Sequence, residues 1–464
     1  MKDYIIVGGG PSGLSLAYEL SKFGYSVQVI EKDDQLGGSW KSNFDQNGYF
    51  QETSPKVFIE GPYTKKLLKS LNINENEFRG VYGTRIETIL KLTSTMYNHF
   101  SPLDYIKYLY GYLYITVHDK KTLQEFIDHA GMSEKGRLFM RIISSVLEQS
   151  PSQTNARDFF IGLDPFITIK QMIDTNKWHR EIEKSIVSQG NIVQKSASVK
   201  SINKINNGFG VNTLNGVFYA KKVVLATQSD AIANILQASP GLENNWGPIE
   251  KIQEWSQSTH YSSFGFQLHF DTIVEFPEQW CWSCQDSWNI IILPVSNWLT
   301  KFSNRQNIKT VWSCCIVNLD DKSSVTSKTV NETSEYQEVL DEAMRQIRQY
   351  PNIPEPFKIT TSKGLYHNGK KWISANTGFS TGKHYRLKME GANPGLYALG
   401  CFTYTGASGV SYFGRAIAAS ALYLNTYEKK VKGFNYKEGY IKLFALFIKL
   451  LIIFYLLSII VNTV

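Results

Sequence analysis

The chain has 464 residues, which is too long for one ordinary hydrophobic core, so we expect two domains. Its five cysteines are few and odd in number, which argues against a disulfide framework and favours a reducing compartment. The formal net charge is +8, but no interleaving of aromatic and basic residues indicates a nucleic-acid partner.

A glycine-rich motif stands near the start of the chain. Residues 4–7 have the pattern of a buried strand and lead into G-x-G-x-x-G, with Gly8, Gly10 and Gly13, followed by an amphipathic helix. In this setting the first glycine permits a tight turn, the second lets the backbone approach a pyrophosphate, and the third lets helix and strand pack closely. The free N–H groups of the helix N-terminus favour phosphates.

A second strand and an acidic residue complete the signature. Residues 27–30 predict another buried strand, and Glu31 stands at its end, where a carboxylate can bind the ribose hydroxyls of an adenosine. These parts together predict a bound dinucleotide, and at this point FAD and NAD both remain open. We expect no signal peptide ahead of the first strand, because no basic segment or cleavage site precedes it.

The rest of the chain alternates between helical and strand-rich regions. Residues 62–189 are mostly helical in pattern, and residues 191–226 predict a small antiparallel sheet that feeds into a buried strand. Residues 258–373 are rich in strands, interrupted by one helix with the sequence SEYQEVLDEAMRQIRQY. Residues 394–427 predict a strand, a glycine-rich turn and a helix.

The C-terminal segment has the composition of a membrane anchor. Residues 443–461 are 19 residues with Lys449 as the only charge, close to the length that spans a bilayer as a helix. The alternatives are a core helix or an interfacial anchor, because a lysine reaches water only from near the end of a span. Residues 428–442 form a basic linker, which favours a single-pass tail anchor with the globular part in the cytoplasm.

The order of these motifs resembles the flavin-dependent amine oxidoreductase superfamily, which includes monoamine oxidases, protoporphyrinogen oxidases and phytoene desaturases. The resemblance covers nearly all of the chain up to about Tyr427 and includes the segments LGGSW, ETSPKVF, VVLAT and PGLYALGCFT. The double glycine, Gly37 and Gly38, is specific to the FAD branch of this fold. The resemblance therefore implies that the dinucleotide is FAD.

Position by position, the resemblance implies a set of cofactor-binding residues on several short segments. These are Gly8, Gly10, Pro11, Ser12, Gly13, Glu31, Lys32, Gly37, Gly38, Ser39, Trp40, Ser54, Pro55, Lys56, Val199, Ala226, Thr227, Gly400, Cys401 and Val410. The arginine that usually follows the double glycine in the family is missing, and Lys41 is the cation that could replace it.

Several of these positions have individual expected roles. The segment containing Pro55 and Lys56 would pass beside the flavin ring, and the backbone of Val199 would meet the adenine. Cys401 stands where the family has an aspartate that binds the ribityl chain, so a backbone N–H must make that contact. The helix that begins near Val410 would direct its N–H groups at the flavin N1 and C2 carbonyl.

The resemblance also implies the fold class and the domain boundaries. We expect an α/β protein in which a doubly wound, Rossmann-type FAD-binding domain is interleaved with an α+β substrate domain, followed by a C-terminal transmembrane helix. The FAD-binding domain would comprise residues 1–60, 190–235 and 390–427, and the substrate domain residues 61–189 and 236–389.

The expected function is that of an FAD-dependent oxidoreductase. It would take a hydride from a lipophilic small-molecule donor to flavin N5, with reoxidation by oxygen or another acceptor. The family's lysine near flavin N5 is absent from the matching stretch SSFGFQLHF, which puts amine oxidation in doubt. No catalytic side chain and no metal site is identified.

Two other functions remain as alternatives. One is a non-catalytic escort of lipids or prenyl groups, because escort proteins resemble this fold without using flavin. The other is a flavin monooxygenase-like enzyme, which would need a second G-x-G-x-x-G for NADPH, and the chain has none.

Four cysteines and two histidines are candidate reactive groups. Cys281 and Cys284 form a C-x-x-C pair whose packing role is favoured over a redox role. The adjacent residues Cys314 and Cys315 are expected in the core. His269 and His384 have no partner carboxylate nearby in sequence and are expected to be structural.

Overall fold

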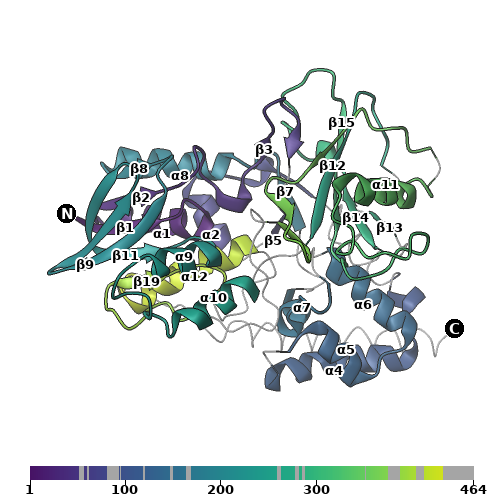
Figure 1. The fold of residues 1–464 in the computed structure, drawn as a ribbon, viewed down its shortest axis with the longest axis horizontal. Coiled ribbons are helices and arrows are strands. Elements are labelled where there is room, and N and C mark those ends of the chain that lie inside the picture. The colour runs from purple at the N-terminus through teal and green to yellow at the C-terminus, as the bar shows by residue number, and fades with distance from the viewer. Residues whose placement is uncertain are drawn as a thin grey trace.

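The computed structural model describes residues 1–51, 57–59, 62–80, 94, 96–118, 121–146, 150–162, 169–258, 263–276, 282–284, 288–350, 352–374, 387–403 and 412–431. A seven-stranded sheet with helices on both faces forms one half of the molecule, on the left in Figure 1. A five-stranded sheet and a group of helices form the other half.

The large sheet has a parallel centre and an antiparallel edge. Its strand order is β8-β2-β1-β11-β10-β9, and β19 also pairs with β11. The pairs that join β1, β2, β8, β11 and β19 are parallel, whereas β9, β10 and β11 pair antiparallel. The bounds are β1 Lys2–Val7, β2 Val27–Ile30, β8 Ile192–Gln194, β9 Val199–Ile205, β10 Gly208–Thr213, β11 Gly216–Leu225 and β19 Leu396–Ala398.

Alternate residues of β1 supply the cores on the two faces of this sheet. Tyr4 and Ile6 belong to the core beneath α1 (Pro11–Lys22), α2 (Pro62–Ser70), α8 (Lys177–Ser188) and α12 (Tyr412–Thr426). Ile5 and Val7 belong to the core beneath α9 (Ser229–Gln237) and α10 (Ile249–Ser258). Because β1 is buried on both faces, its sequence is a continuous apolar run. This burial on both faces confirms the predicted doubly wound α/β architecture.

One strand differs from the sequence prediction. Residues 192–194 were expected in the small antiparallel sheet, but β8 instead pairs parallel with β2 at the other edge. Helix α8 returns the chain beside β2, as expected for a crossover between parallel strands. The buried Asn191 side chain fixes this return, because its Oδ1 accepts a hydrogen bond of 2.8 Å from the Val27 N–H and its Nδ2 donates to Ser21 Oγ.

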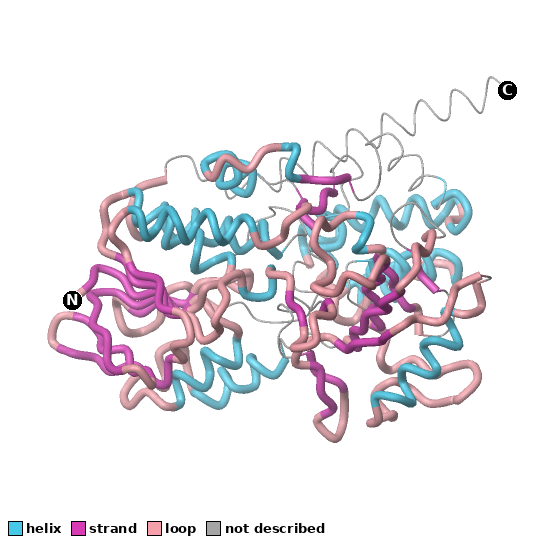
Figure 2. Tube along the Cα trace, turned by 90° about the horizontal axis from the view of Figure 1, so that it is seen from above, coloured by secondary structure: helices cyan, strands magenta, loops and turns pink. Residues whose placement is uncertain are grey.

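The second half is built on a five-stranded sheet of order β13-β14-β15-β12-β16, whose core also includes α11 (Tyr336–Ile347). Its strands are β12 Phe264–Phe270, β13 Trp282–Cys284, β14 Ile290–Leu293, β15 Thr310–Ile316 and β16 Lys358–Thr361. The smaller sheets pair β3 (Asn43–Phe44) with β4 (Phe50–Gln51), β17 (Leu365–His367) with β18 (Trp372–Ser374), and β5 (Val57–Ile59) with β7 (Ile169–Met172) and β6 (Phe78–Gly80). Figure 2 shows one group of strands at the end near the N-terminus and the other strands from the middle of the molecule towards the right.

Four helices form a separate apolar cluster below the second sheet in Figure 1. They are α4 (Pro102–Val117), α5 (Leu123–Ala130), α6 (Glu134–Val146) and α7 (Ala156–Gly162), and they confirm the helical prediction for this part of the chain. The segment YIKYLYGYLYITV, rich in aromatic residues, forms most of α4. It buries Tyr108 and Tyr112 in the cluster, while Ile106 is exposed on the opposite side.

No helix within the described ranges is long and apolar enough to cross a membrane. Residues 443–461 lie outside those ranges, so the membrane anchor stays a prediction. Cys281, the side chain of Cys284, and His384 also lie outside the described residues.

The described cysteines and histidine of the second sheet are buried as expected. Cys314 and Cys315 are buried on β15. His269 is fully buried on β12, and its Nε2 lies 3.0 Å from Thr360 Oγ1. Burial lowers the pKa of His269 to about 4, so this imidazole is neutral at physiological pH.

Asp104 joins two helices of the four-helix cluster. Its carboxylate accepts hydrogen bonds from the N–H and hydroxyl of Ser101, which caps α4, and from the N–H of Ser133 at 2.8 Å. Burial opposes ionisation, but these hydrogen bonds outweigh it and lower the pKa of Asp104 to about 2.

Asp104→Asn should lower the local opening free energy of α4 by roughly 1–2 kcal/mol, because the ionised acceptor is lost. Amide hydrogen exchange of α4 at neutral pH measures this change, with Asp128→Asn on the exposed surface of α5 as the control. The folded-state pKa lies below the ordinary 3.8, so the charge stabilises fully above that value and the stabilisation disappears as the pH falls towards about 2. Equal protection of α4 in both variants would contradict this role.

Candidate functional site

The turn between β1 and α1 is closed by two glycines that leave no room for a side chain. Gly8 has a φ of +111°, and a Cβ there would lie 2.4 Å from the Ala226 carbonyl oxygen. A Cβ on Gly13 would lie 2.0 Å from the Gly8 carbonyl oxygen. The first and third glycines of the motif therefore pack helix, strand and neighbouring strand against one another, as the sequence predicted.

Gly10, the second glycine, is in a different environment. Its φ of −84° is accessible to any residue, and the nearest atom to a Cβ there would be the Gly38 Cα at 3.9 Å. The space in front of Gly10 belongs to a cavity that this residue lines. The backbone at Gly10 is thus exposed to whatever occupies that cavity.

This cavity lies where β1, β2, β11 and β19 end. In an open parallel sheet, ligands bind at this carboxyl edge. Of the predicted cofactor-binding residues, the following line the cavity: Gly8, Gly10, Pro11, Ser12, Glu31, Lys32, Gly38, Ser39, Trp40, Val199, Ala226, Thr227, Gly400 and Cys401. Segments separated by up to several hundred residues therefore meet at one site.

The other predicted residues fall into two groups. Gly13 and Gly37 are described but do not line the cavity: Gly13 packs beneath the turn, and Gly37 has a φ of +109° beside His179. Ser54, Pro55, Lys56 and Val410 lie outside the described residues.

The Glu31 carboxylate is fixed at the end of β2 by two backbone donors. One oxygen accepts a hydrogen bond of 2.6 Å from the Gly9 N–H, and the other accepts one of 2.9 Å from the Asp33 N–H. Glu31 is buried but lines the cavity. Because a carboxylate oxygen has two lone pairs, each oxygen can still accept from a ligand hydroxyl.

Lys41 is committed to an intramolecular ion pair. Its ammonium lies 2.7 Å from Asp33 Oδ2 and 2.9 Å from the Gln35 carbonyl oxygen, and its side chain is 5% exposed. Burial raises the pKa of Asp33, but the hydrogen bond and charge of Lys41 outweigh burial and lower it. Both side chains line the cavity. The sequence analysis considered Lys41 but missed Asp33, which sets the position of the lysine.

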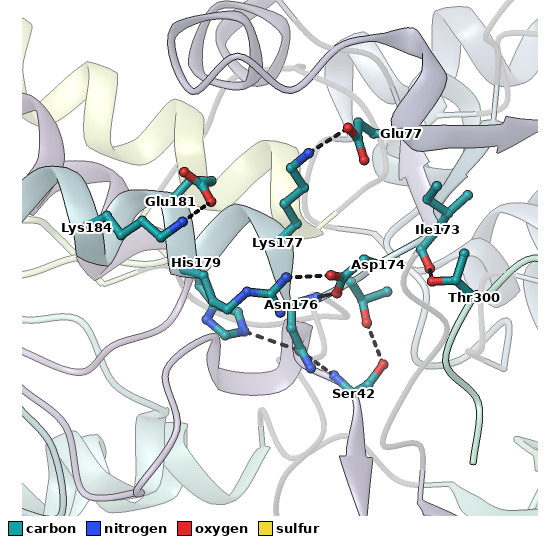
Figure 3. A network of polar contacts seen from close by, with 12 residues as sticks. Ser42, Glu77, Ile173, Asp174, Asn176, Lys177, His179, Glu181, Lys184 and Thr300 are labelled. Atoms are coloured by element: carbon teal, nitrogen blue, oxygen red, sulfur yellow. Dashed lines mark hydrogen bonds and ion pairs between the residues drawn. The ribbon is translucent and has the colours of Figure 1, made fainter. Parts of the chain in front are cut away.

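The loop after the double glycine, residues 37–42, is supported by the start of α8. Asn176 Oδ1 accepts a hydrogen bond of 3.0 Å from the Ser42 N–H, and the Trp178 indole donates one of 3.2 Å to the Trp40 carbonyl. Figure 3 shows Ser42, Asn176 and His179 within this polar network. Trp40 in turn packs against Phe413 of α12, with ring centroids 4.9 Å apart.

His179 lies beside Gly37 of the double glycine, and it is neutral. Its Nε2 lies 3.2 Å from Asn176 Oδ1, and its Nδ1 is buried with no hydrogen-bond partner. Burial, together with the charges of Arg180 and Lys41, lowers the pKa of His179 to about 3. This imidazole therefore packs against the loop and does not titrate near neutrality.

The second half of the molecule contributes residues that the sequence analysis missed. Lys363 and Ser374, beyond β16 and at the end of β18, line the same cavity. Gln228, Ser229 and Asp230 at the start of α9 also line it. No motif marks Lys363 or Ser374, because only the tertiary fold brings them to the site.

Comparison with known families identifies the first part of the chain. The family of NAD(P)-binding Rossmann-like domains matches residues 6–71. The matched segment includes the end of β1, together with α1, β2 and α2.

Curated relatives match over short stretches. An L-amino-acid oxidase from Trimeresurus stejnegeri is 33% identical over 79 residues, 17% of this chain and 15% of the relative. An FAD-binding monooxygenase from Epichloe uncinata is 46% identical over 41 residues, 9% of this chain and 8% of the relative. A 1-hydroxycarotenoid 3,4-desaturase from Flavobacterium sp. (strain P99-3) is 41% identical over 58 residues, 12% of each chain. The chain thus spans 15% or less of these relatives.

Solved structures match over nearly the whole chain. An oxidoreductase from Methanosarcina mazei has a TM-score of 0.59 and 13% identity, covering 90% of this chain and 99% of the other. A putrescine oxidase bound to putrescine has a TM-score of 0.56 and 14% identity, covering 90% and 97%. At these identities the likeness concerns the fold, and it confirms the predicted resemblance to the amine oxidoreductases at that level.

The pair of Lys41 and Asp33 yields a test of the site's architecture. Lys41→Met should lower the thermal unfolding temperature, because it leaves the Asp33 carboxylate half-buried without its cation. In the double variant with Asp33→Asn, much of this loss should be recovered, giving a coupling energy of roughly 1 kcal/mol or more in a double-mutant cycle.

The effect should also depend on pH. Because the folded-state pKa of Asp33 is lowered, the stabilisation by Lys41 is present at neutral pH and is lost as the pH falls through that value. Strictly additive effects of the two substitutions at pH 7 would show that the ion pair does not stabilise this loop.

Proposed function

We propose that the protein is an FAD-dependent oxidoreductase that takes a hydride from a lipophilic small-molecule donor. The observation that carries this proposal is the cavity at the carboxyl edge of the large sheet. The glycine turn, the end of β2, the start of α9 and the end of β19 all line it. The FAD-binding relative and the fold shared with oxidases support the same cofactor and reaction class.

The residues of the cavity fit a dinucleotide. The turn before α1 offers the free N–H groups of a helix N-terminus to a pyrophosphate, with no side chain at Gly10 to block the approach. The oriented Glu31 carboxylate would accept from the adenosine ribose hydroxyls. Cys401 cannot act as an anionic acceptor like the family's aspartate, so its backbone would make the contact with the ribityl chain.

Lysines around the cavity replace the family's missing arginine. Lys41 is paired with Asp33, so this ion pair contributes little net charge. Lys32 and Lys363 also line the cavity, and they come from opposite halves of the molecule. Lys363 would bring a positive charge to the phosphates from the second half, and this would couple cofactor binding to the contact between the halves.

Bound FAD would supply the hydride-accepting chemistry. The chain would orient the donor, exclude water and hold the cofactor. His179 is neutral and packs against the loop, so we assign it no proton transfer. Oxygen or another acceptor would complete the cycle, and we propose no catalytic acid or base among the described residues.

We further propose that the C-terminal segment anchors the protein to a membrane, with the remainder on the cytoplasmic side. The proposal is supported by the sequence of residues 443–461 and by the lysines that precede it. An enzyme held at a membrane would meet donors that partition into lipid, which is the reason for proposing a lipophilic donor.

The absorbance spectrum of the purified full-length chain tests the proposed function. We expect flavin bands, release of the cofactor by acid, and its identification as FAD by chromatography. Anaerobic addition of a true donor should bleach the flavin bands, and admitting the acceptor should restore them. A colourless protein that cannot be reconstituted with FAD would instead support a non-catalytic escort function on the same fold.

Two alanine substitutions should separate cofactor binding from folding. Gly10→Ala should preserve the unfolding temperature of the cofactor-free protein, because the Cβ meets no protein atom closer than 3.9 Å, yet weaken FAD binding at least roughly tenfold. Gly13→Ala should destabilise the fold itself, because its Cβ would overlap the Gly8 carbonyl oxygen. Equilibrium dialysis and thermal unfolding measure the two effects. If Gly10→Ala binds FAD as tightly as the unmodified protein, FAD does not bind in this cavity.

The anchor can be tested on a reporter protein. A soluble fluorescent protein fused to residues 425–464 should sediment with membranes and resist extraction with carbonate, as a spanning helix does. The same fusion with Leu450, Leu451 and Ile452 replaced by aspartates should be soluble. Release of the unmodified fusion by salt alone would indicate a surface anchor in place of a spanning helix.

A further inference from the structure

A second cavity lies beside α2, separate from the dinucleotide site. Its volume is about 400 Å³, within the range of small-molecule sites. The lining residues come from α2, the loop that follows it, and the neighbouring strands β6 and β7: Thr64, Lys65, Leu68, Lys69, Asn72, Ile73, Asn74, Glu75, Phe78 and Lys170. None of these residues lines the first cavity.

One polar group in this cavity has an unmet hydrogen-bonding requirement. Thr64 is 3% exposed, and its hydroxyl oxygen has no hydrogen-bond partner among the residues that the structure describes. Buried hydroxyls are nearly always paired, so an unpaired one that lines a cavity indicates a missing partner. A hydroxyl can donate to an anionic oxygen, which makes a carboxylate or phosphate a suitable partner.

The charges around Thr64 favour an anion. Lys65 and Lys69 lie one turn apart on α2, a helix whose sequence contains no acidic residue. Like charges at this spacing destabilise a helix, and a lysine in the first turn opposes the helix dipole. Among the described residues no carboxylate pairs with either lysine, whereas Lys170 is paired with Glu75. An anion in the cavity would offset both costs.

The rest of the cavity is apolar. Leu68 and Ile73 are buried members of the core beneath α1, α2, α8 and α12, and Phe78 packs against the same core. A small inorganic anion would make no apolar contact with the parts of these side chains that line the cavity. A ligand with an alkyl chain would cover them and bring an anionic group to Thr64 at the same time.

We propose that this cavity binds an amphiphilic anion, an alkyl chain that carries a carboxylate or a phosphate. The head group accepts a hydrogen bond from Thr64 and lies between Lys65 and Lys69. The alkyl chain packs on Leu68, Ile73 and Phe78. The proposal concerns residues outside the dinucleotide site and does not depend on the proposed redox function.

Calorimetric titration of the full-length protein tests the proposal with octanoate, octyl phosphate and inorganic phosphate as probes. Thr64→Val removes the hydroxyl at nearly constant shape, and Thr64→Ser retains it. Lys65→Gln and Lys69→Gln each remove a lining charge. Lys66→Gln is the matched control, because Lys66 is exposed on the same helix but does not line the cavity.

We expect octanoate or octyl phosphate to bind, and octyl phosphate to bind more tightly than inorganic phosphate because its alkyl chain is buried. Thr64→Val should weaken binding about tenfold or more, and Thr64→Ser should restore it to within a few-fold. Each lining lysine variant should lose roughly two- to fivefold, whereas Lys66→Gln should bind like the unmodified protein. A preference for octanoate over octyl phosphate, or the reverse, identifies which head group the site takes.

Three results would overturn the proposal. The first is binding of inorganic phosphate as tight as that of octyl phosphate, since the alkyl contact would then contribute nothing. The second is that Lys69→Gln and Lys66→Gln bind the probes with equal affinity. This comparison can be made even if Thr64→Val fails to fold. The third is no heat of binding for any probe. If the protein does not bind FAD but these titrations give the expected results, only the proposed function is contradicted.

Discussion

The arrangement of the nucleotide-binding half depends on how closely α1 approaches the strands beneath it. The Gly8 carbonyl oxygen lies only 2.0 Å from the position that a Cβ on Gly13 would occupy, and a Cβ on Gly8 would lie 2.4 Å from the Ala226 carbonyl oxygen. Only glycine permits these contacts, and they bring the N-terminus of α1 to the ends of β1 and β11. The dipole and free N–H groups of the helix then face a cavity into which distant parts of the chain also converge. The close approach that the two glycines permit thus determines both the packing of α1 and the electrostatics of the site.

The rest of the site is held in place by contacts that span long stretches of sequence. Asn176 and Trp178 of the α8 region hold the backbone of the loop at Trp40 and Ser42, and Phe413 of α12 packs on Trp40. The side chains of Ser15 and Ser420 join α1 to α12 with a contact of 2.7 Å. The loop after the double glycine is therefore fixed from two sides, which favours a preformed site over one that is assembled on binding.

Local sequence predicts those features of the site that depend on local chemistry. The glycine spacing, the apolar run of β1 and the acid after β2 each require particular residues at particular positions, so the turn, the two-sided sheet and the place of Glu31 could be predicted. The parallel pairing of β8 could not, because alternation of polar and apolar residues is the same for either strand direction. Asp33, Lys363 and Thr64 were missed for another reason: their importance lies in partners, or a missing partner, that only the tertiary fold defines.

We propose that one dinucleotide contacts the glycine turn, the start of α9 and the end of β19 together. Hydrogen exchange of the cofactor-free protein with and without FAD tests it directly. The account predicts that FAD slows exchange in residues 8–13, 226–231 and 399–402 at the same time, with NAD producing no comparable protection. Protection confined to other segments, or no protection by FAD at saturating concentration, would contradict it.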